Sequence, residues 1–185
     1  MIDQALKQAD EKMRKAIEVA REEFGGIRTG RASPALVQRI NVDYYGTPTP
    51  LQQLAGISVP DPRSLAIAPY DRNAIASIEK AIQSSDLGIT PSNDGTTIRL
   101  NFPPLTEERR KELIKVVRDR AEHGRVAIRN VRRHAKEEIE RDQKAGEVSE
   151  DEMHRAEKEL QKLTDRYVAE VDEMLQRKET ELMEV

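Results

Sequence analysis

Hydrophobic residues recur every three or four positions over residues 2–27, a spacing typical of an amphipathic helix with one buried stripe. The stripe consists of Ile2, Leu6, Ala9, Met13, Ala16, Ala20, Phe24 and Ile27. Gly25 and Gly26 interrupt it, and each glycine costs about 1 kcal/mol relative to alanine in a helix interior. Because Ile27 continues the pattern, we predict that the helix passes through both glycines and ends near Gly30.

A second long helix is predicted over residues 106–143, where the same spacing recurs. Its stripe consists of Leu113, Val117, Ala121, Gly124, Ile128, Val131, Ala135 and Ile139. Thr106 can cap its N-terminus, and Glu107 and Glu108 place negative charge at the positive end of the helix dipole. Gly146 is expected to end the helix, because glycine readily adopts the left-handed conformation found at that position.

A third helix is predicted to begin after Ser149, which forms an S-x-x-E capping box with Glu152. Its stripe consists of Met153, Ala156, Leu160, Leu163, Tyr167, Val171 and Met174. Three long helices with one apolar stripe each can bury those stripes against one another, which predicts a three-helix bundle. An open coiled-coil oligomer is the alternative, but the short turn at Gly146 favours an intramolecular hairpin.

Residues 31–105 follow a different pattern, because this segment is proline-rich and contains short runs that favour strands. These runs are RINVDYY, LAGISV, SLAIAPY and TTIRLNF. Residues 73–85 between them have helical spacing, and an Asn-Asp-Gly sequence at 93–95 marks a turn. The segment is therefore predicted to form a small β/α/β unit.

The α/β segment lies between the first and second helices, so the predicted fold is α+β with a discontinuous bundle. We expect one domain to comprise residues 1–30 and 106–185, and an inserted domain to comprise residues 31–105. The chain crosses between them near 29–34 and 101–106. Both crossings contain proline, which restricts local collapse while leaving the connection able to bend, so we predict hinges there.

Composition narrows the class of protein. Charged residues make up 35% of the chain, hydrophobic residues 37% and aromatic residues 3%, which suits long helices with a wide solvated face. The absence of cysteine excludes disulfides and thiolate metal sites. Because the sequence contains no apolar run long enough for a membrane span and no signal-peptide pattern at the N-terminus, we expect a cytoplasmic protein without membrane association.

The formal net charge of −3 argues against a nucleic-acid partner, but the charge is unevenly distributed. From Arg109 to Arg133 there are ten Lys or Arg and three Asp or Glu, a local charge of +7. From Ser149 to Val185 there are six Lys or Arg and twelve Asp or Glu, a local charge of −6. The local field rather than the average should therefore select the partner.

Basic residues of the second helix share a narrow arc about 90° from the apolar stripe. They are Arg118, Arg125, Arg129, Arg132 and Lys136. One interpretation is that they pair with the acidic third helix. Exposed ion pairs contribute at most about 1 kcal/mol, however, and arginine can grip phosphates with two parallel hydrogen bonds. We therefore favour binding of a polyanion.

The aromatic content limits the kind of polyanion contact. No aromatic residue lies between Leu105 and Arg166, so stacking of splayed bases is disfavoured in the basic region. Contact with the backbone and shape of structured RNA remains. No pattern for a nucleophile, a phosphate-binding loop or a metal site is present, and we expect the histidines His123, His134 and His154 to be solvated. We therefore expect a non-enzymatic protein without cofactor or metal.

Five segments together resemble the ribosome recycling factor family of bacteria, in an order and spacing that cover the whole chain. They are IRTGRASP at 27–34, YYGTPTPL at 44–51, SDLG at 85–88, FPPLTEERRK at 102–111 and RNVRR at 129–133. Gly25-Gly26 departs from the family pattern. The resemblance implies an L-shaped, two-domain protein with a three-helix bundle, a hinge and a small β/α/β domain.

The resemblance also implies a function in translation after termination. A family member would bind the post-termination ribosome and, with elongation factor G and GTP, promote its dissociation into subunits. Large-subunit rRNA would contact the positions that match the family's basic residues, which here are Arg28, Arg31, Arg109, Arg110, Arg129, Arg132 and Arg133. The hinge would comprise Gly30, Ala32, Ser33, Pro103, Pro104 and Leu105.

Two other functions stay open at this point. A helical scaffold would dimerise, whereas we expect a monomer. A general RNA chaperone would anneal arbitrary oligonucleotides, whereas a recycling factor would prefer assembled ribosomes.

Overall fold

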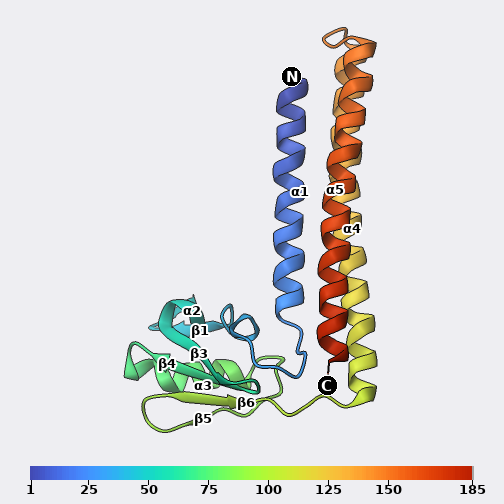
Figure 1. The fold of residues 1–185 in the computed structure, drawn as a ribbon. Coiled ribbons are helices and arrows are strands. Elements are labelled where there is room, and N and C mark those ends of the chain that lie inside the picture. The colour runs from blue at the N-terminus through green and yellow to red at the C-terminus, as the bar shows by residue number, and fades with distance from the viewer. Residues whose placement is uncertain (185) are drawn as a thin grey trace. The chain divides into compact units, whose positions relative to one another are not determined.

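The computed structural model describes residues 1–184. The chain divides into two units, one formed by Met1–Phe24 with the chain from Leu113 onward and the other by Gly25–Glu112. Figure 1 shows long helices in the first unit and a small mixed unit containing all the strands of the described residues. This agrees with the predicted fold class of a helical bundle with an inserted α/β unit.

The bundle is built from α1 (Ile2–Gly25), α4 (Glu107–Lys144) and α5 (Glu150–Met183), which run side by side in Figure 1. Each helix buries one stripe of mostly small and aliphatic side chains. The stripes comprise Ala5, Ala9, Met13, Ile17, Ala20 and Phe24 of α1, Leu113, Val117, Ala121, Gly124, Ile128, Ala135 and Ile139 of α4, and Ala156, Leu160, Thr164, Tyr167, Val171, Met174 and Leu182 of α5.

The predicted end of the first helix is wrong. α1 ends at Gly25 rather than near Gly30, and Ile27 lies outside it. Two consecutive glycines lose more backbone entropy on entering a helix than any other pair, and one half-buried isoleucine does not compensate. The stripe also shifts on α5, where Thr164 is buried while Leu163 is half-buried. Thr164 satisfies its hydroxyl by donating to the Leu160 carbonyl oxygen at 2.8 Å.

The termini of α4 and α5 follow the predicted signals. The Thr106 hydroxyl oxygen accepts from the Arg109 amide at 3.1 Å at the start of α4. At its end Gly146 has a φ of +75°, and the two backbone hydrogen bonds of a Schellman motif form around it. The Ser149 side chain accepts from the Glu152 amide, and the Glu152 carboxylate accepts from the Ser149 amide, which completes the predicted capping box.

The inserted unit contains two antiparallel sheets in the described residues. A two-stranded sheet pairs β1 (Asn41–Tyr44) with β2 (Thr47–Pro50). A four-stranded sheet has the order β3-β4-β6-β5. Its strands are β3 (Ala55–Asp61), β4 (Ser64–Pro69), β5 (Ser92–Asn93) and β6 (Ile98–Asn101).

Helical segments connect these strands. They are the 3₁₀ helices η1 (Pro34–Leu36) and η2 (Arg72–Ala74), and the α-helices α2 (Leu51–Leu54) and α3 (Ile75–Gln83). Ile78 and Ile82 of α3 belong to the same buried cluster as the inward side chains of β4 and β6. The alternating burial along β6 shows that α3 and the sheet enclose the core between them.

Two strands of the described residues, β2 and the two-residue β5, were not predicted. β2 has the sequence TPTP, and its two prolines argue against a strand because proline cannot donate to a sheet ladder. β2 pairs only with β1 in the described residues, so the side of each proline that lacks an N–H faces no further strand. The predicted turn at 93–95 is present, with Gly95 at a φ of +95° between β5 and β6.

Candidate nucleic-acid interface

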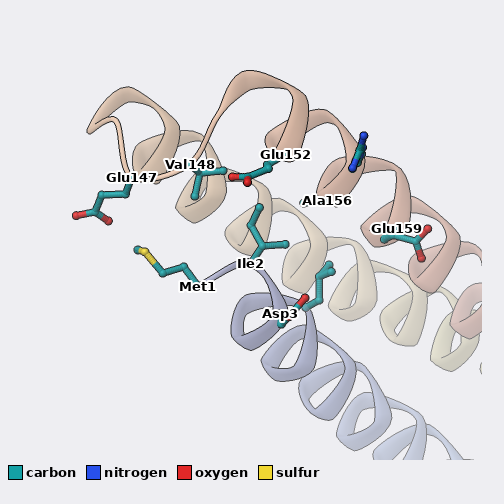
Figure 2. Close-up of a pocket in the computed structure, with 10 residues that line it drawn as sticks. Met1, Ile2, Asp3, Glu147, Val148, Glu152, Ala156 and Glu159 are labelled. Atoms are coloured by element: carbon teal, nitrogen blue, oxygen red, sulfur yellow. The ribbon is translucent and has the colours of Figure 1, made fainter.

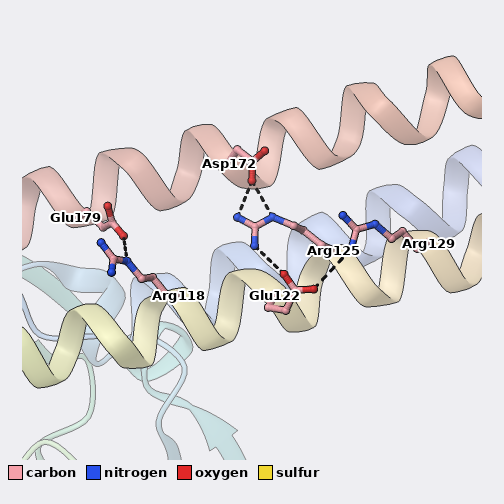
Figure 3. Close-up of polar contacts among 6 residues, drawn as sticks. All are labelled: Arg118, Glu122, Arg125, Arg129, Asp172 and Glu179. Atoms are coloured by element: carbon pink, nitrogen blue, oxygen red, sulfur yellow. Dashed lines mark hydrogen bonds and ion pairs between the residues drawn. The ribbon is translucent and has the colours of Figure 1, made fainter.

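The basic arc of α4 separates into two groups once its partners are known. Figure 3 shows that Arg118 and Arg125 reach across to carboxylates of α5. The Nε of Arg118 lies 2.7 Å from Oε1 of Glu179. The Nε and Nη2 atoms of Arg125 lie 2.8 and 2.6 Å from Oδ1 of Asp172. The pairing interpretation is therefore correct for these two arginines.

Arg125 is the more buried of the two arginines, because 18% of its side chain is exposed compared with 64% for Arg118. It also donates to Glu122 of its own helix at 3.0 Å. Burial opposes its charge, but the hydrogen bonds and charges of Asp172 and Glu122 raise the pKa of Arg125. An arginine held in this way ties α4 to α5 and is a poor candidate for contact with a separate polyanion.

The other arginines, Arg129, Arg132 and Arg133, form weaker interactions with the rest of the bundle. Arg129 is half exposed and lies 3.6 Å from Glu122 (Figure 3). Arg132 donates from Nη1 to the neutral amide oxygen of Gln161 at 3.0 Å. Arg133 is exposed and has no ion-pair partner among residues 1–184. These three predicted residues lie within two turns of α4, so the structure brings them together as a positively charged surface.

Two hollows in the bundle have opposite charge. The first, of about 510 Å³, lies where the start of α1 meets the α4–α5 turn, and Figure 2 shows Asp3, Glu147 and Glu159 around its apolar floor. The second, of about 750 Å³, lies between α4 and α5. It is lined by Arg132, Arg133, Lys136, His154, Glu157, Lys158, Leu160 and Gln161. A polyanion is repelled by the first and attracted by the second.

The remaining predicted arginines lie near the crossings. Arg28 is half-buried, donates from Nη2 to the Pro103 carbonyl oxygen at 3.0 Å, and lies 5.7 Å from the Phe102 ring centroid. Burial, followed by the nearby Arg109 charge, lowers the pKa of Arg28. This side chain therefore has a structural role in joining the two crossings, in addition to any contact with RNA.

Arg31 is exposed, and Arg109 forms an ion pair with Glu112 at 2.8 Å while remaining 57% exposed. Arg110 is half-buried, and its Nε has no hydrogen-bond partner in the described structure. Arg28 and Arg31 lie in the segment after α1, Arg109 and Arg110 lie near the start of α4, and Arg129, Arg132 and Arg133 lie further along α4. The predicted binding residues thus form two groups rather than one.

The predicted hinge residues differ in how firmly they are held. Gly30 has a φ of +85°, and a Cβ atom there would lie 3.6 Å from Leu105. Ala32 donates to the Pro62 carbonyl oxygen at 2.7 Å, and Ser33 caps η1. Pro103 accepts from Arg28, and Pro104 is exposed. The first crossing is therefore fixed to the inserted unit from Ala32 onward.

Three residues beside Arg132 were missed from the sequence as members of a site. Lys158 and Gln161 lie on the acidic third helix, and His154 was expected only to be solvated. Its side chain is 57% exposed and lines the second hollow. Helical periodicity places residues on one face of one helix, whereas this hollow depends on which face of α5 lies against α4. The spacing of Lys158 and Gln161 alone could not show that.

Comparison with known proteins identifies the family. The family model described as ribosome recycling factor matches residues 20–183. The ribosome-recycling factors of Acidothermus cellulolyticus and Thermobifida fusca are 60% and 58% identical over 185 residues, covering all of both chains. The chain belongs to the ribosome recycling factor family. By this membership it is a translation factor that functions in ribosome recycling, rather than an enzyme.

Solved structures agree with this assignment. A solution structure of a ribosome recycling factor has a TM-score of 0.80 at 45% identity, covering 100% of this chain and 98% of the other. A second has a TM-score of 0.70 at 46% identity and full coverage of both chains. That structure describes the T. thermophilus ribosome recycling factor and the E. coli elongation factor G bound to the E. coli post-termination complex.

In the described residues no helix is both long and apolar enough to cross a bilayer, and no group of three potential metal ligands occurs there.

Proposed function

We propose that the chain binds the post-termination ribosome and, with elongation factor G and GTP, promotes its dissociation into subunits. The observation that carries this proposal is full-length similarity to curated ribosome-recycling factors. A structural relative described together with elongation factor G on a post-termination complex supports the choice of partners. The protein would act in the cytoplasm, where ribosomes are, and as a monomer.

The proposed contact with large-subunit rRNA uses the basic residues in two groups. One group, well inside α4, comprises Arg129, Arg132 and Arg133, and the other, near the two crossings, comprises Arg28, Arg31, Arg109 and Arg110. Phosphate contacts of this kind anchor and orient a protein without reading sequence. Arg132 is the strongest candidate, because its guanidinium is held in place by a neutral amide and keeps its charge available.

The proposed hinge comprises Gly30, Ala32, Ser33, Pro103, Pro104 and Leu105, between domains at residues 1–30 with 106–185 and 31–105. Hydrogen bonds at Ala32 and Ser33 argue that bending on the first crossing concentrates before them, between the end of α1 and Gly30. The glycines at 25, 26 and 30 supply backbone freedom there. The bundle would act as a stiff strut, because its packed stripes resist bending.

Subunit dissociation of post-termination ribosomes, measured by light scattering with the protein, a cognate elongation factor G and GTP, tests the proposal. The wild-type protein should split ribosomes, and Arg132→Ala should weaken large-subunit binding while leaving thermal unfolding nearly unchanged. Arg120→Ala is the matched control, because it removes the same charge from an exposed position of α4 outside the proposed site. Absence of splitting by the wild-type protein would disprove the main proposal.

The same preparation separates the other functions. A helical scaffold would dimerise as concentration rises in size measurements, and an RNA chaperone would anneal free oligonucleotides as readily as it binds ribosomes. Equal ribosome binding by wild type and Arg132→Ala would remove Arg132 from the interface.

A further inference from the structure

The hollow between α4 and α5 has a strong local excess of positive charge. Its lining carries four Arg or Lys side chains and one carboxylate. The cations are Arg132, Arg133 and Lys136 of α4 and Lys158 of α5, and the carboxylate is Glu157. This is unexpected for α5, because the segment from Ser149 onward carries a net charge of −6. Three of the cations come from α4, and Lys158 adds a fourth from the otherwise acidic third helix.

Lys158 is available for a ligand. It is exposed and has no ion-pair partner among residues 1–184. Lys162, one turn further along α5, is already paired with Glu159 at 3.4 Å. The single carboxylate of the hollow is itself oriented toward an imidazole, since Oε2 of Glu157 lies 3.8 Å from Nδ1 of His154. Glu157 is therefore the one carboxylate of the hollow, and it is turned toward His154.

Gln161 holds Arg132 without neutralising it. Its Oε1 accepts from Nη1 of Arg132 at 3.0 Å, while its Nε2 donates to Oδ1 of Asp165 at 2.8 Å. Because Asp165 can only accept, the amide is fixed with its oxygen toward Arg132. Arg125 is the contrasting case, since Asp172 occupies its guanidinium with a full negative charge at 2.6 Å. An oriented arginine loses less freedom when a phosphate binds.

We propose that the α4–α5 hollow is a two-helix site for phosphates of the RNA backbone, in which Lys158 contacts phosphate and Gln161 positions Arg132. The site is large enough at about 750 Å³ for a phosphate and its flanking riboses, and its lining includes Arg132 and Arg133 of the proposed rRNA contact. The proposal rests on ribosome binding by the α4 arginines and extends that contact to the third helix.

Salt titration of large-subunit binding by the full chain tests the role of Lys158. Each phosphate contact adds about one unit to the slope of log Kobs against log salt concentration, because a counterion is released. Lys158→Ala should reduce affinity and lower the slope by about one. Lys162→Ala should change neither, because that lysine lies outside the hollow and is already paired. Binding by Lys158→Ala that matches wild type at all salt concentrations would overturn the proposal.

Two replacements of Gln161 test positioning. Gln161→Glu keeps the size but places a carboxylate against Arg132, so affinity should fall and the slope should decrease by about one. Gln161→Met removes the acceptor but no charge, so affinity should fall at an unchanged slope. A merely structural role would lower thermal stability without this difference in slope. Unchanged binding by Gln161→Glu would contradict the positioning role.

Arg132→Ala separates this inference from the function on which it rests. If Arg132→Ala weakens binding while the Lys158 and Gln161 variants do not, the hollow is not the site but ribosome binding by α4 stands. If Arg132→Ala binds as wild type does, Arg132 lies outside the interface and the two-helix site is wrong.

Discussion

The bundle and the inserted unit bury their side chains in different ways. Of the largest fully buried side chains among the described residues, eight lie in the inserted unit and five in the bundle. The five are Met13, Ile128, Ile139, Leu160 and Leu182. A helix with one narrow stripe relies on alanine and glycine for close approach, whereas a sheet covered by a helix encloses large aliphatic groups completely. The long bundle spreads its core thinly, and the small unit concentrates it.

The carboxylates of the two units also differ in the groups that they pair with. The carboxyl groups with a lowered pKa, Asp61, Asp71 and Asp94, all lie in the inserted unit. Backbone amides are the leading cause at each, because turns and short helices leave N–H groups that these side chains satisfy. In the bundle the amides are used within the helices, and its carboxylates pair with surface cations instead. The two units should therefore respond differently to mutation and to acid.

Removal of a large side chain from the concentrated core should have the largest effect. Ile78 of α3 is fully buried, so Ile78→Ala should destabilise the inserted unit by about 2–5 kcal/mol through lost burial and a residual cavity. Three of the four tyrosines, Tyr44, Tyr45 and Tyr70, lie in this unit. Near-ultraviolet circular dichroism should report its unfolding, while the signal at 222 nm is dominated by the bundle.

Ile128→Ala in α4 is the matched control for that measurement, because it removes the same groups from a fully buried position of the bundle. It should shift the 222 nm transition, and only the contribution of Tyr167 to the tyrosine signal should move with it. If both signals move together in both variants, the two units unfold as one cooperative body and the comparison between them fails.

The second-largest effect should be a loss of stability of the inserted unit in acid. Asp94 accepts from the backbone amides of Thr96 and Thr97, the leading causes of its lowered pKa. A carboxyl whose folded pKa lies below its unfolded value of about 3.9 contributes stability above that value, and the contribution is lost as pH falls through the folded pKa. The tyrosine signal of wild type should therefore show falling stability below about pH 4.

Asp94→Asn should make this unit less stable at neutral pH but flatten its dependence on pH below about 4, since the asparagine carries no titrating charge. Glu11→Gln, at an exposed position of α1, serves as the control and should leave the acid dependence of the tyrosine signal unchanged. An Asp94→Asn variant that loses stability with acid as steeply as wild type would show that Asp94 is not a source of the dependence.

The sequence predicted the fold best where residues close together in the chain determine the local structure. The capping box at Ser149 and the helix end at Gly146 depend on residues next to one another, and both are present. The end of α1 is harder to predict, because a periodic apolar residue at 27 competes with two adjacent glycines and the glycines prevail. The strand β2 was missed because its prolines are tolerated only at an edge, which depends on the sheet as a whole.

The candidate site was predictable in part for the same reason. Periodicity alone placed Arg129 and Arg132 on one face, and the family resemblance added Arg133. Periodicity could not show that Arg125 forms an ion pair with an α5 carboxylate, whereas Arg132 donates to a neutral amide. That distinction depends on the rotation of α5 about its own axis relative to α4. Gln161 carries no charge, so no charge pattern could have pointed to it.

A glycine in the thin core of the bundle gives the smallest and most specific prediction. A Cβ atom on Gly124 would lie 3.7 Å from Ala20 and from Val171, an ordinary van der Waals distance. Because Gly124 is helical and its neighbours leave room for a methyl group, Gly124→Ala should stabilise the bundle by up to about 1 kcal/mol. Thermal unfolding followed at 222 nm measures this change.

Gly146→Ala provides the opposite case, because no atom lies within 4 Å of the position that a Cβ would occupy there, but the φ of Gly146 is +75°. Only backbone strain can act there, so this variant should be destabilised by about 1 kcal/mol. A loss of stability in Gly124→Ala would mean that the helices cannot yield even to a methyl group. The bundle would then be packed at Gly124 as tightly as the inserted core, and the contrast between a thin core and a concentrated one would not hold at that crossing.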